Sequence, residues 1–359
     1  MKIFITGVCG FVGSELAISL RNLGHHVCGC DNFCRLGSRS NKDIIERIGV
    51  RFWEGDVRFT EHLERAGDVD WVIDAAALPS VLAGVGGGDE SRGVMETNLW
   101  GTVNMLEFCK KRGSGMIVLS TSRVYSIGSI SALPLKEHDR MFLLERGCDG
   151  AGRGGLTENF STGAPISLYG ASKLSSEILA LEYGRAFGFP VVVNRCGLMA
   201  GGGQFGTAEQ GIVNYWIRRW MQRKPLFYQG FGGRGIQTRD CLHPRDLALL
   251  VNKQINSPAV GDFQIFNVSG GVGSAFSLRQ LSDWCLERIG HHEIGVDASE
   301  RPFDVPWVIL DSERAGDAWD WEPKTSVWDI FEEIVTMNQK TPASQDSMFS
   351  QGLFPRQGE

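Results

Sequence analysis

Three glycines near the start of the chain, in the segment 7–13, constrain its fold more than any other feature. They stand between an apolar segment, 3–6, which is typical of a buried strand, and an amphipathic segment that predicts a helix to about residue 23. Glycines at this spacing allow a tight turn, a close approach of the backbone to a pyrophosphate, and close packing of the helix on the strand. The pattern predicts a dinucleotide site formed by the turn and the helix N-terminus: Gly7, Gly10, Phe11, Val12 and Gly13.

An acidic residue, Asp31, follows the second predicted strand and lies 18 positions beyond Gly13. A carboxylate there can accept hydrogen bonds from ribose hydroxyls and would repel a 2′-phosphate, which favours NAD over NADP. Asp56 follows a third predicted strand, 50–54, where it can reach the adenine amino group or simply form a turn. Their neighbours Asn32 and Val57 complete this part of the expected cofactor site.

Strand and helix patterns then continue to alternate along the chain. Apolar segments at 71–77, 116–120 and 191–194 predict further strands, and a long helix is expected at about 90–111. Such alternation implies right-handed crossovers and an α/β fold with a doubly wound parallel sheet, whose ligands lie beyond the carboxyl ends of the strands. The cofactor site is therefore expected to include residues of these segments: Ala75, Ala76, Asn98 and Cys196.

The length and charge of the chain limit its partners. A chain of 359 residues is long enough for about two lobes, and a net charge of -6 disfavours nucleic acid or an anionic membrane surface. The nine cysteines include no CxxC pair, so we expect buried thiols and no metal. No apolar run approaches ~18 residues and Met1 leads directly into the first strand, which predicts a cytoplasmic protein.

A change in sequence character after residue 195 indicates the domain organisation. We expect residues 1–195, joined by about 236–256, to form an NAD-binding Rossmann domain. Residues 196–235 and 257–339 are expected to form a smaller α/β lobe that binds the substrate, and 340–359 a flexible tail. The polar, glycine-rich stretch at 126–155 predicts a surface excursion or a lid.

Two residues at helical spacing are candidates for the chemistry. Tyr169 and Lys173 lie one turn apart in a segment that predicts a helix over 167–187, and a neighbouring cation favours ionisation of a phenol. The pair can therefore act as a general base, although a solvated helix face would carry the same spacing. Thr121 and Ser122 follow the fifth strand, where a hydroxyl can orient a substrate hydroxyl or merely cap the strand end.

Taken in order, these motifs resemble the extended short-chain dehydrogenase/reductases that act on nucleotide sugars, from Met1 to about residue 338. The resemblance implies an enzyme that holds NAD, binds a nucleotide-diphosphate sugar and forms a homodimer. It also implies that Thr121 accompanies Tyr169 and that Lys173 holds the nicotinamide ribose. The substrate-binding residues expected on this basis are Ser80, Arg123, Asn194, Gln204, Gln210, Arg239, Asn267 and Arg301, with Arg239 and Arg301 on the diphosphate.

The resemblance also bears on the reaction. Sugar dehydratases of this family carry an Asp-Glu pair after the threonine, and Ser122 and Arg123, which stand there instead, cannot do that acid/base work. The stretches 31–37, 121–125 and 203–211 are most similar to family members that invert C2 of a CDP-linked sugar by transient oxidation. Inversion at C4 of a UDP-hexose, a net NAD-dependent dehydrogenase or reductase, and a non-catalytic dinucleotide sensor stay open as alternatives.

Overall fold

The protein was analysed as a computed structural model that describes residues 1–35, 37–82, 85, 90–258 and 264–340. Of the tail predicted at 340–359, the residues 341–359 lie outside the described part of the chain. Within the described part of the chain, no helix is long and apolar enough to cross a membrane.

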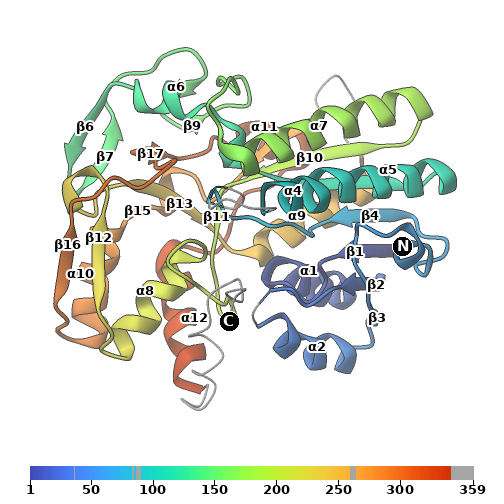
Figure 1. The fold of residues 1–359 in the computed structure, drawn as a ribbon, viewed down its shortest axis with the longest axis horizontal. Coiled ribbons are helices and arrows are strands. Elements are labelled where there is room, and N and C mark those ends of the chain that lie inside the picture. The colour runs from blue at the N-terminus through green and yellow to red at the C-terminus, as the bar shows by residue number, and fades with distance from the viewer. Residues whose placement is uncertain (36, 83–84, 86–89, 259–263, 341–359) are drawn as a thin grey trace, which may run out of the picture.

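A seven-stranded sheet in which every pair is parallel forms the centre of the larger lobe (Figure 1). Its spatial order is β14-β10-β5-β4-β1-β2-β3, so the chain runs outward from β1 and then returns to β4 beside it. This reversal creates a crevice at the carboxyl ends of β1 and β4, and the predicted doubly wound α/β fold is confirmed. The strands are β1 Lys2–Thr6, β2 His26–Asp31, β3 Arg51–Glu54, β4 Trp71–Asp74, β5 Gly115–Thr121, β10 Val191–Cys196 and β14 Ile265–Val268.

Helices cover both faces of this sheet because each presents one apolar side to it. One face packs against α1 Phe11–Asn22, α2 Ser38–Arg47, α9 Pro244–Asn256 and α11 Glu313–Trp319. The other packs against α3 Thr60–Glu64, α5 Gly101–Arg112 and α7 Ser167–Phe187. The helix predicted at 90–111 is observed as α4 Glu90–Met95, a π-helical turn η1 Glu96–Trp100, and α5.

Two strands differ from the sequence expectation. The smaller lobe was expected to include all of 257–339, but β14 pairs with β10 from Val193↔Ile265 to Cys196↔Val268 and is the seventh strand of the main sheet. The reason is that α9, which precedes it, packs on α1 and returns the chain to this edge. The strand predicted at 71–77 is shorter in the structure, where β4 ends at Asp74. The next two backbone N–H groups, of Ala75 and Ala76, donate to the Thr6 hydroxyl instead of to a carbonyl of a neighbouring strand.

The smaller lobe has its own core, built around Trp216, Trp220, Tyr228 and Phe331. Its elements are α8 Ile212–Met221, α10 Leu278–Ile289, α12 Val327–Lys340 and the two-stranded sheet of β12 Leu226–Gln229 with β16 Ile294–Asp297. A further small sheet contains β11 Leu198–Met199, β13 Thr238–Leu242, β15 Ala275–Ser277 and β17 Trp307–Val308.

The stretch at 126–155 lies at the surface as predicted, with most of its residues exposed or half-buried, but it contains regular secondary structure and a few buried side chains. It forms α6 Ile127–Ser131, the hairpin β6 Leu135–His138 and β7 Met141–Leu144, β8 Ala151–Gly152, and, just beyond, β9 Gly155–Leu156. Its apolar side chains share a core with 305–310. The glycines allow close backbone contact here: a Cβ on Gly155 would lie 2.5 Å from the Ile309 carbonyl oxygen.

Candidate active site

A cleft of about 930 Å³ opens at the carboxyl ends of the central strands and extends to the smaller lobe. It brings together most of the residues that the sequence suggested, although they are spread over some 300 positions. The predicted residues that line it are Gly7, Gly10, Phe11, Val12, Gly13, Asp31, Asn32, Val57, Ala75, Ala76, Thr121, Ser122, Arg123, Tyr169, Cys196, Gln204, Gln210, Arg239 and Arg301.

The glycine turn has the geometry that a pyrophosphate requires. Gly7 adopts a φ of 64°, and its carbonyl oxygen accepts the Gly10 N–H at 2.9 Å. A Cβ on Gly13 would lie 2.1 Å from the Gly7 oxygen, so only glycine lets α1 approach the turn this closely. No side chain caps α1, which leaves N–H groups of its first turn available to an anion.

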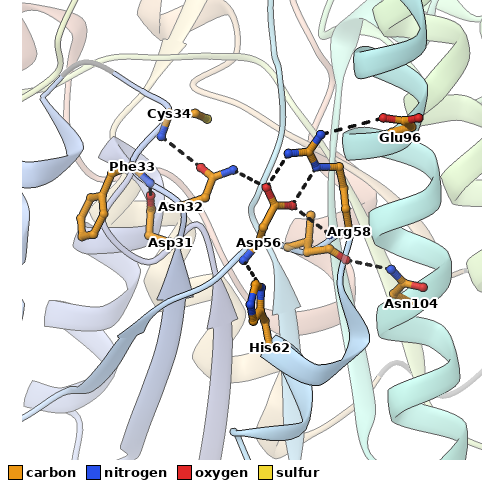
Figure 2. A network of polar contacts seen from close by, with 10 residues as sticks. Asp31, Asn32, Phe33, Cys34, Asp56, Arg58, His62, Glu96 and Asn104 are labelled. Carbon is orange, nitrogen blue, oxygen red and sulfur yellow. Dashed lines mark hydrogen bonds and ion pairs between the residues drawn. The ribbon is translucent and has the colours of Figure 1, made fainter.

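The second strand ends in a polar network that shapes the adenosine end of the cleft (Figure 2). The buried Asp31 carboxylate accepts the N–H groups of Cys9 at 3.0 Å and Phe33 at 2.8 Å, while burial raises its pKa. These bonds fix the carboxylate beside the glycine turn, where a ribose diol would meet it. Asn32 extends the network by donating to Asp56 at 2.9 Å.

Asp56 lies behind the cleft wall and is held by a neighbour that the sequence did not identify. Arg58 donates to its two carboxylate oxygens at 3.0 and 2.8 Å. Burial acts to raise the pKa of Asp56, but the hydrogen bonds from Arg58 and Asn32 outweigh it and lower the pKa to about 2. Because Val57 lines the cleft and Asp56 does not, the adenine contact of Asp56 stays a prediction.

Tyr169 and Lys173 lie on the buried side of α7, where they are 7% and 2% exposed. A solvated helix face is therefore excluded, and Tyr169 lines the cleft. The sequence suggested that a neighbouring cation lowers the pKa of this phenol toward the neutral range. The side chains around Tyr169 do not lower it that far. Burial raises the pKa of Tyr169 to about 12, against the opposing effects of a hydrogen bond with Thr121 and the charges of Arg123 and Arg35.

Lys173 lies one helical turn after Tyr169 and extends toward the ends of the central strands. Its charge opposes the effect of burial on the pKa of Asp74, at the end of β4, and of Cys196, at the end of β10, which lines the cleft. Its contact with the nicotinamide ribose stays a prediction. Asn98, in the π-helical turn, supports the wall from behind by bonding both to Leu78 and to the Ser172 hydroxyl next to Lys173.

Three arginines line the far end of the cleft: Arg123, Arg239 and Arg301. Arg239 donates to Asp304 at 3.1 Å and to the Val305 carbonyl at 2.8 Å, and Arg301 donates to the Ala208 carbonyl at 3.1 Å. Burial, with the charges of Arg239 and Arg301, lowers the pKa of Arg123 to about 10, while Asp304 acts in the opposite direction. Guanidinium groups are suited to bidentate binding of phosphate, and carboxylates of the same cleft, Asp304 and Asp240 among them, balance part of their charge.

Gln204 and Gln210 line the cleft from the loop that precedes α8. Gln204 donates its amide N–H to the Met199 carbonyl at 3.0 Å, which fixes the orientation of the side chain. The Oε1 atoms of both glutamines are buried and lack a hydrogen-bond donor within the described part of the chain. Ligand hydroxyls can supply the missing donors.

Three predicted substrate-binding residues do not reach the cleft. The Asn194 amide is fully buried and pairs with Gln254 of α9 at 2.9 and 2.8 Å. Asn267 accepts the Tyr125 hydroxyl at 2.6 Å and donates to the Leu156 carbonyl at 2.8 Å. Side chains alternate between the faces of a strand, and these two turn toward packed neighbours. Ser80 is likewise buried outside the cleft lining, where it donates to Glu209 at 3.4 Å.

Glu177, which the sequence reasoning missed, anchors α7 beneath the site. It lies eight residues after Tyr169, on the same side of the helix, and accepts hydrogen bonds from Ser120 and Arg195. Ser120 directly precedes Thr121. This anchor therefore fixes α7 against the end of β5, and its spacing from Tyr169 was the signal that could have revealed it.

The glycine turn and the buried Tyr-Lys pair beside the cleft are the features of a Rossmann-fold enzyme that uses a dinucleotide. Consistent with this, the model of the NAD dependent epimerase/dehydratase family matches residues 3–269, and the chain belongs to this family. Its cofactor is NAD.

Known proteins resemble the chain over nearly its whole length. CDP-paratose 2-epimerase of Salmonella typhi is 28% identical over 338 residues, which span 92% of this chain and 96% of that protein. UDP-glucose 4-epimerase of Corynebacterium glutamicum is 27% identical over 334 residues, with 90% and 91% covered. The structure of UDP-glucose 4-epimerase with UDP-glucose from Thermotoga maritima superposes with a TM-score of 0.75 at 26% identity, covering 95% of this chain and 99% of that one.

Proposed function

We propose that the protein is an epimerase that inverts C2 of a CDP-linked deoxysugar through a keto-sugar intermediate. The observation that carries the proposal is that Tyr169 faces the same cleft as the glycine turn at one end and the three arginines at the other. A substrate whose diphosphate binds Arg239 and Arg301 can then place its sugar at Tyr169. Bound NAD supplies the hydride acceptor for the oxidation.

In this mechanism the phenolate of Tyr169 removes a proton from a sugar hydroxyl, which Thr121 and Ser122 orient, as the carbon loses its hydride. The keto-sugar then turns its other face, and Tyr169 returns the proton to the oxygen as the hydride comes back to the carbon. Substrate and product therefore differ only in the configuration of the one carbon that is oxidised and then reduced. The protein's contribution is to position the groups and to exclude water.

A contact between the lobes supports retention of the cofactor through this cycle. A Cβ on Gly37 would lie 1.9 Å from the ring of Phe205, so the loop before α8 lies directly against the loop after β2. A cleft-lining residue of the smaller lobe, Phe205, thus contacts the loop after β2. An enzyme that oxidises and then reduces the same substrate benefits from such closure, whereas one that exchanges its cofactor at each turnover does not.

The choice of a CDP-sugar rests on the overall similarity to CDP-paratose 2-epimerase, together with the resemblance noted in the sequence of the segments 31–37, 121–125 and 203–211. Inversion at C4 of a UDP-hexose is the second candidate, because UDP-glucose 4-epimerases align over a similar length. A net dehydrogenase would use the same Tyr169 and Lys173.

A substrate panel separates these functions. Purified protein is incubated with CDP-, UDP- and GDP-sugars without added nicotinamide, and the products are identified by NMR. We expect CDP-paratose to be inverted at C2. Inversion only at C4 of UDP-hexoses would establish the second candidate, and stoichiometric release of NADH would establish a dehydrogenase.

The homodimer expected from the family resemblance also belongs to this proposal. Apolar side chains remain exposed on α7, where Ile178 is 56% and Phe187 49% exposed, and on the π-helical turn η1, where Trp100 is 57% exposed. A second copy of the chain would cover such side chains. Light scattering on the purified protein, with a mass of twice 39.5 kDa as the expected result, tests this.

A further inference from the structure

A buried carboxyl group, that of Asp74, lies at the end of β4, directly before the cleft-lining residues Ala75 and Ala76. Asp74 is 1% exposed, and each of its two carboxyl oxygens contacts a threonine hydroxyl. Oδ1 accepts the Thr6 hydroxyl at 3.2 Å, and Oδ2 lies 2.7 Å from the hydroxyl oxygen of Thr102 on α5. Hydroxyl groups therefore hold the carboxyl group on both sides in a region closed to water.

The hydrogens of these hydroxyls show which form of Asp74 fits the site. The Thr102 oxygen lies 2.7 Å from Asp74 and also 2.8 Å from the backbone carbonyl oxygen of Asn98, but a hydroxyl has only one hydrogen to donate. Because a carbonyl has no hydrogen, both contacts can be full hydrogen bonds only when Asp74 is protonated and donates to Thr102. On the other side, the Thr6 hydroxyl accepts two backbone N–H groups and donates its own hydrogen to Oδ1. One oxygen of Asp74 then donates and the other accepts, as in a carboxylic acid.

The titratable groups around Asp74 are consistent with this form. Burial raises the pKa of Asp74, and the charge of Lys173 on α7 and the bonds with Thr102 and Thr6 oppose that effect only in part. The Cys109 thiol of α5 also faces Asp74, and burial raises the pKa of this thiol. A buried acid without a closely bound counter-charge is less costly in its neutral form.

The chain of hydrogen bonds continues from Thr102 to the helix that carries Tyr169. Asn98 lies in the π-helical turn η1, and its side-chain amide donates to the Ser172 hydroxyl at 3.1 Å. Ser172 in turn donates to the Tyr169 carbonyl at 2.8 Å. The Asn98 carbonyl, which Thr102 contacts, also accepts the Ser176 hydroxyl of α7 at 3.0 Å. All of these side chains are buried, so the connection from β4 to α7 is shielded from water.

We propose that Asp74 is a positioning residue that works as a neutral carboxylic acid. Its proton completes the chain of hydrogen bonds through Thr102 and Asn98, and this chain holds the backbone of Tyr169 at the cleft. An ionised Asp74 would take the Thr102 hydrogen and leave that oxygen facing the Asn98 carbonyl with no hydrogen between them, which weakens the attachment of the π-helical turn. The inference rests on the proposed function only in making Tyr169 the base.

Infrared spectroscopy of the NAD-loaded protein at neutral pH tests the protonation of Asp74. A carboxylic acid has a C=O stretching band that a carboxylate lacks. We expect this band in the wild type, its loss in Asp74→Asn, and a shift of its frequency in Thr102→Val, which removes the hydrogen-bond partner. Asp246→Asn is the control that should leave the band in place, because Asp246 is equally buried but accepts a backbone N–H, that of Thr325, at 2.9 Å. If Asp74→Asn removes no acid band, the proposal is overturned. If Asp74→Asn fails to fold, the band shift in Thr102→Val decides.

Kinetics test whether the chain of hydrogen bonds positions Tyr169. The amide of Asp74→Asn can donate to Thr102 and accept from Thr6, so we expect kcat to stay within about twofold of the wild type. Thr102→Val breaks the chain and should lower kcat by about tenfold or more with little change in KM, because a small displacement of the base is costly. An equal loss of kcat in the two variants would show that the site needs the negative charge, and an unchanged kcat in Thr102→Val would show that the chain has no positioning role. Either result overturns the proposal. The infrared result needs no sugar substrate, so it is independent of whether the CDP-sugar assignment holds.

Discussion

The guanidinium of Arg195 donates to both carboxylate oxygens of Glu177, at distances down to 2.7 Å, with the two side chains 5% and 1% exposed. We predict that Glu177→Gln lowers the free energy of unfolding by about 3–5 kcal/mol, because it leaves a buried guanidinium without its counter-charge. Glu332→Gln is the control, since the Arg288–Glu332 pair has the same 2.7 Å separation but is exposed, and about 1 kcal/mol or less is expected. Denaturant unfolding measures both, and equal effects would contradict a structural role for the buried pair.

The glycine turn gives a steric prediction. Gly13→Ala places a Cβ 2.1 Å from the Gly7 carbonyl oxygen, so the turn must shift away from the pyrophosphate position. We expect a stability loss of about 1–3 kcal/mol and at least a tenfold weaker affinity for NAD, measured by calorimetry on protein stripped of nucleotide. Gly93→Ala, in the open surface of α4, should leave both values unchanged or raise stability slightly. Unaltered NAD binding by the first variant would be inconsistent with this turn as the phosphate site.

The catalytic base is tested on α7 itself. Tyr169→Phe removes one oxygen without a cavity, so we expect the fold and NAD content to persist while kcat falls by about 10²- to 10⁴-fold. Tyr183→Phe is the matched control, because its hydroxyl donates to Glu107 on the protein surface. Kinetics with the sugar identified by the substrate panel measure both variants. Near-normal turnover by Tyr169→Phe would refute the phenolate mechanism.

A pH effect on stability is expected where Glu333 of α12 Val327–Lys340 contacts His243 and the backbone N–H of Gly202. The hydrogen bond from His243 lowers the pKa of Glu333 to about 2 from its ordinary 4.5. A carboxylate whose pKa is depressed by folding stabilises the protein above its unfolded value, and this stability is lost as pH falls through the range from about 4.5 to about 2. The melting temperature of the wild type should therefore fall more steeply in this range than that of Glu333→Gln. Parallel curves for the two proteins would show that the His243–Glu333 contact does not contribute.

The local parts of the site were predictable from the sequence. The turn at 7–13 and the Tyr169–Lys173 pair depend on spacings within one turn or one helix, so they followed from the order of residues. The parallel sheet followed from the repeated strand and helix patterns. The structure added that the Tyr-Lys face of α7 is buried, so the two residues are not a pair on a solvated surface.

The residues that were misassigned depend on contacts between distant segments. Asn194 and Asn267 lie on neighbouring strands β10 and β14, and only the arrangement of the sheet shows that Asn194 pairs with Gln254 of α9. The few buried side chains of 126–155, such as Ile130 and Leu133, pack in a core with 305–310, which lies far away in the sequence. The contact of Arg58 with Asp56 was not predicted, because an isolated arginine in a turn belongs to no recognisable motif and its partner depends on the local backbone conformation.

The isotopic content of the product tests the central claim most directly. In a self-contained oxidation and return, Tyr169 handles only the hydroxyl proton, and the carbon-bound hydrogen never exchanges with water. Product formed from CDP-paratose in heavy water should therefore carry no deuterium at the inverted carbon, and NADH should not accumulate. Deuterium at that carbon, or steady release of NADH, would contradict the epimerase account even with the fold and the cofactor site as described.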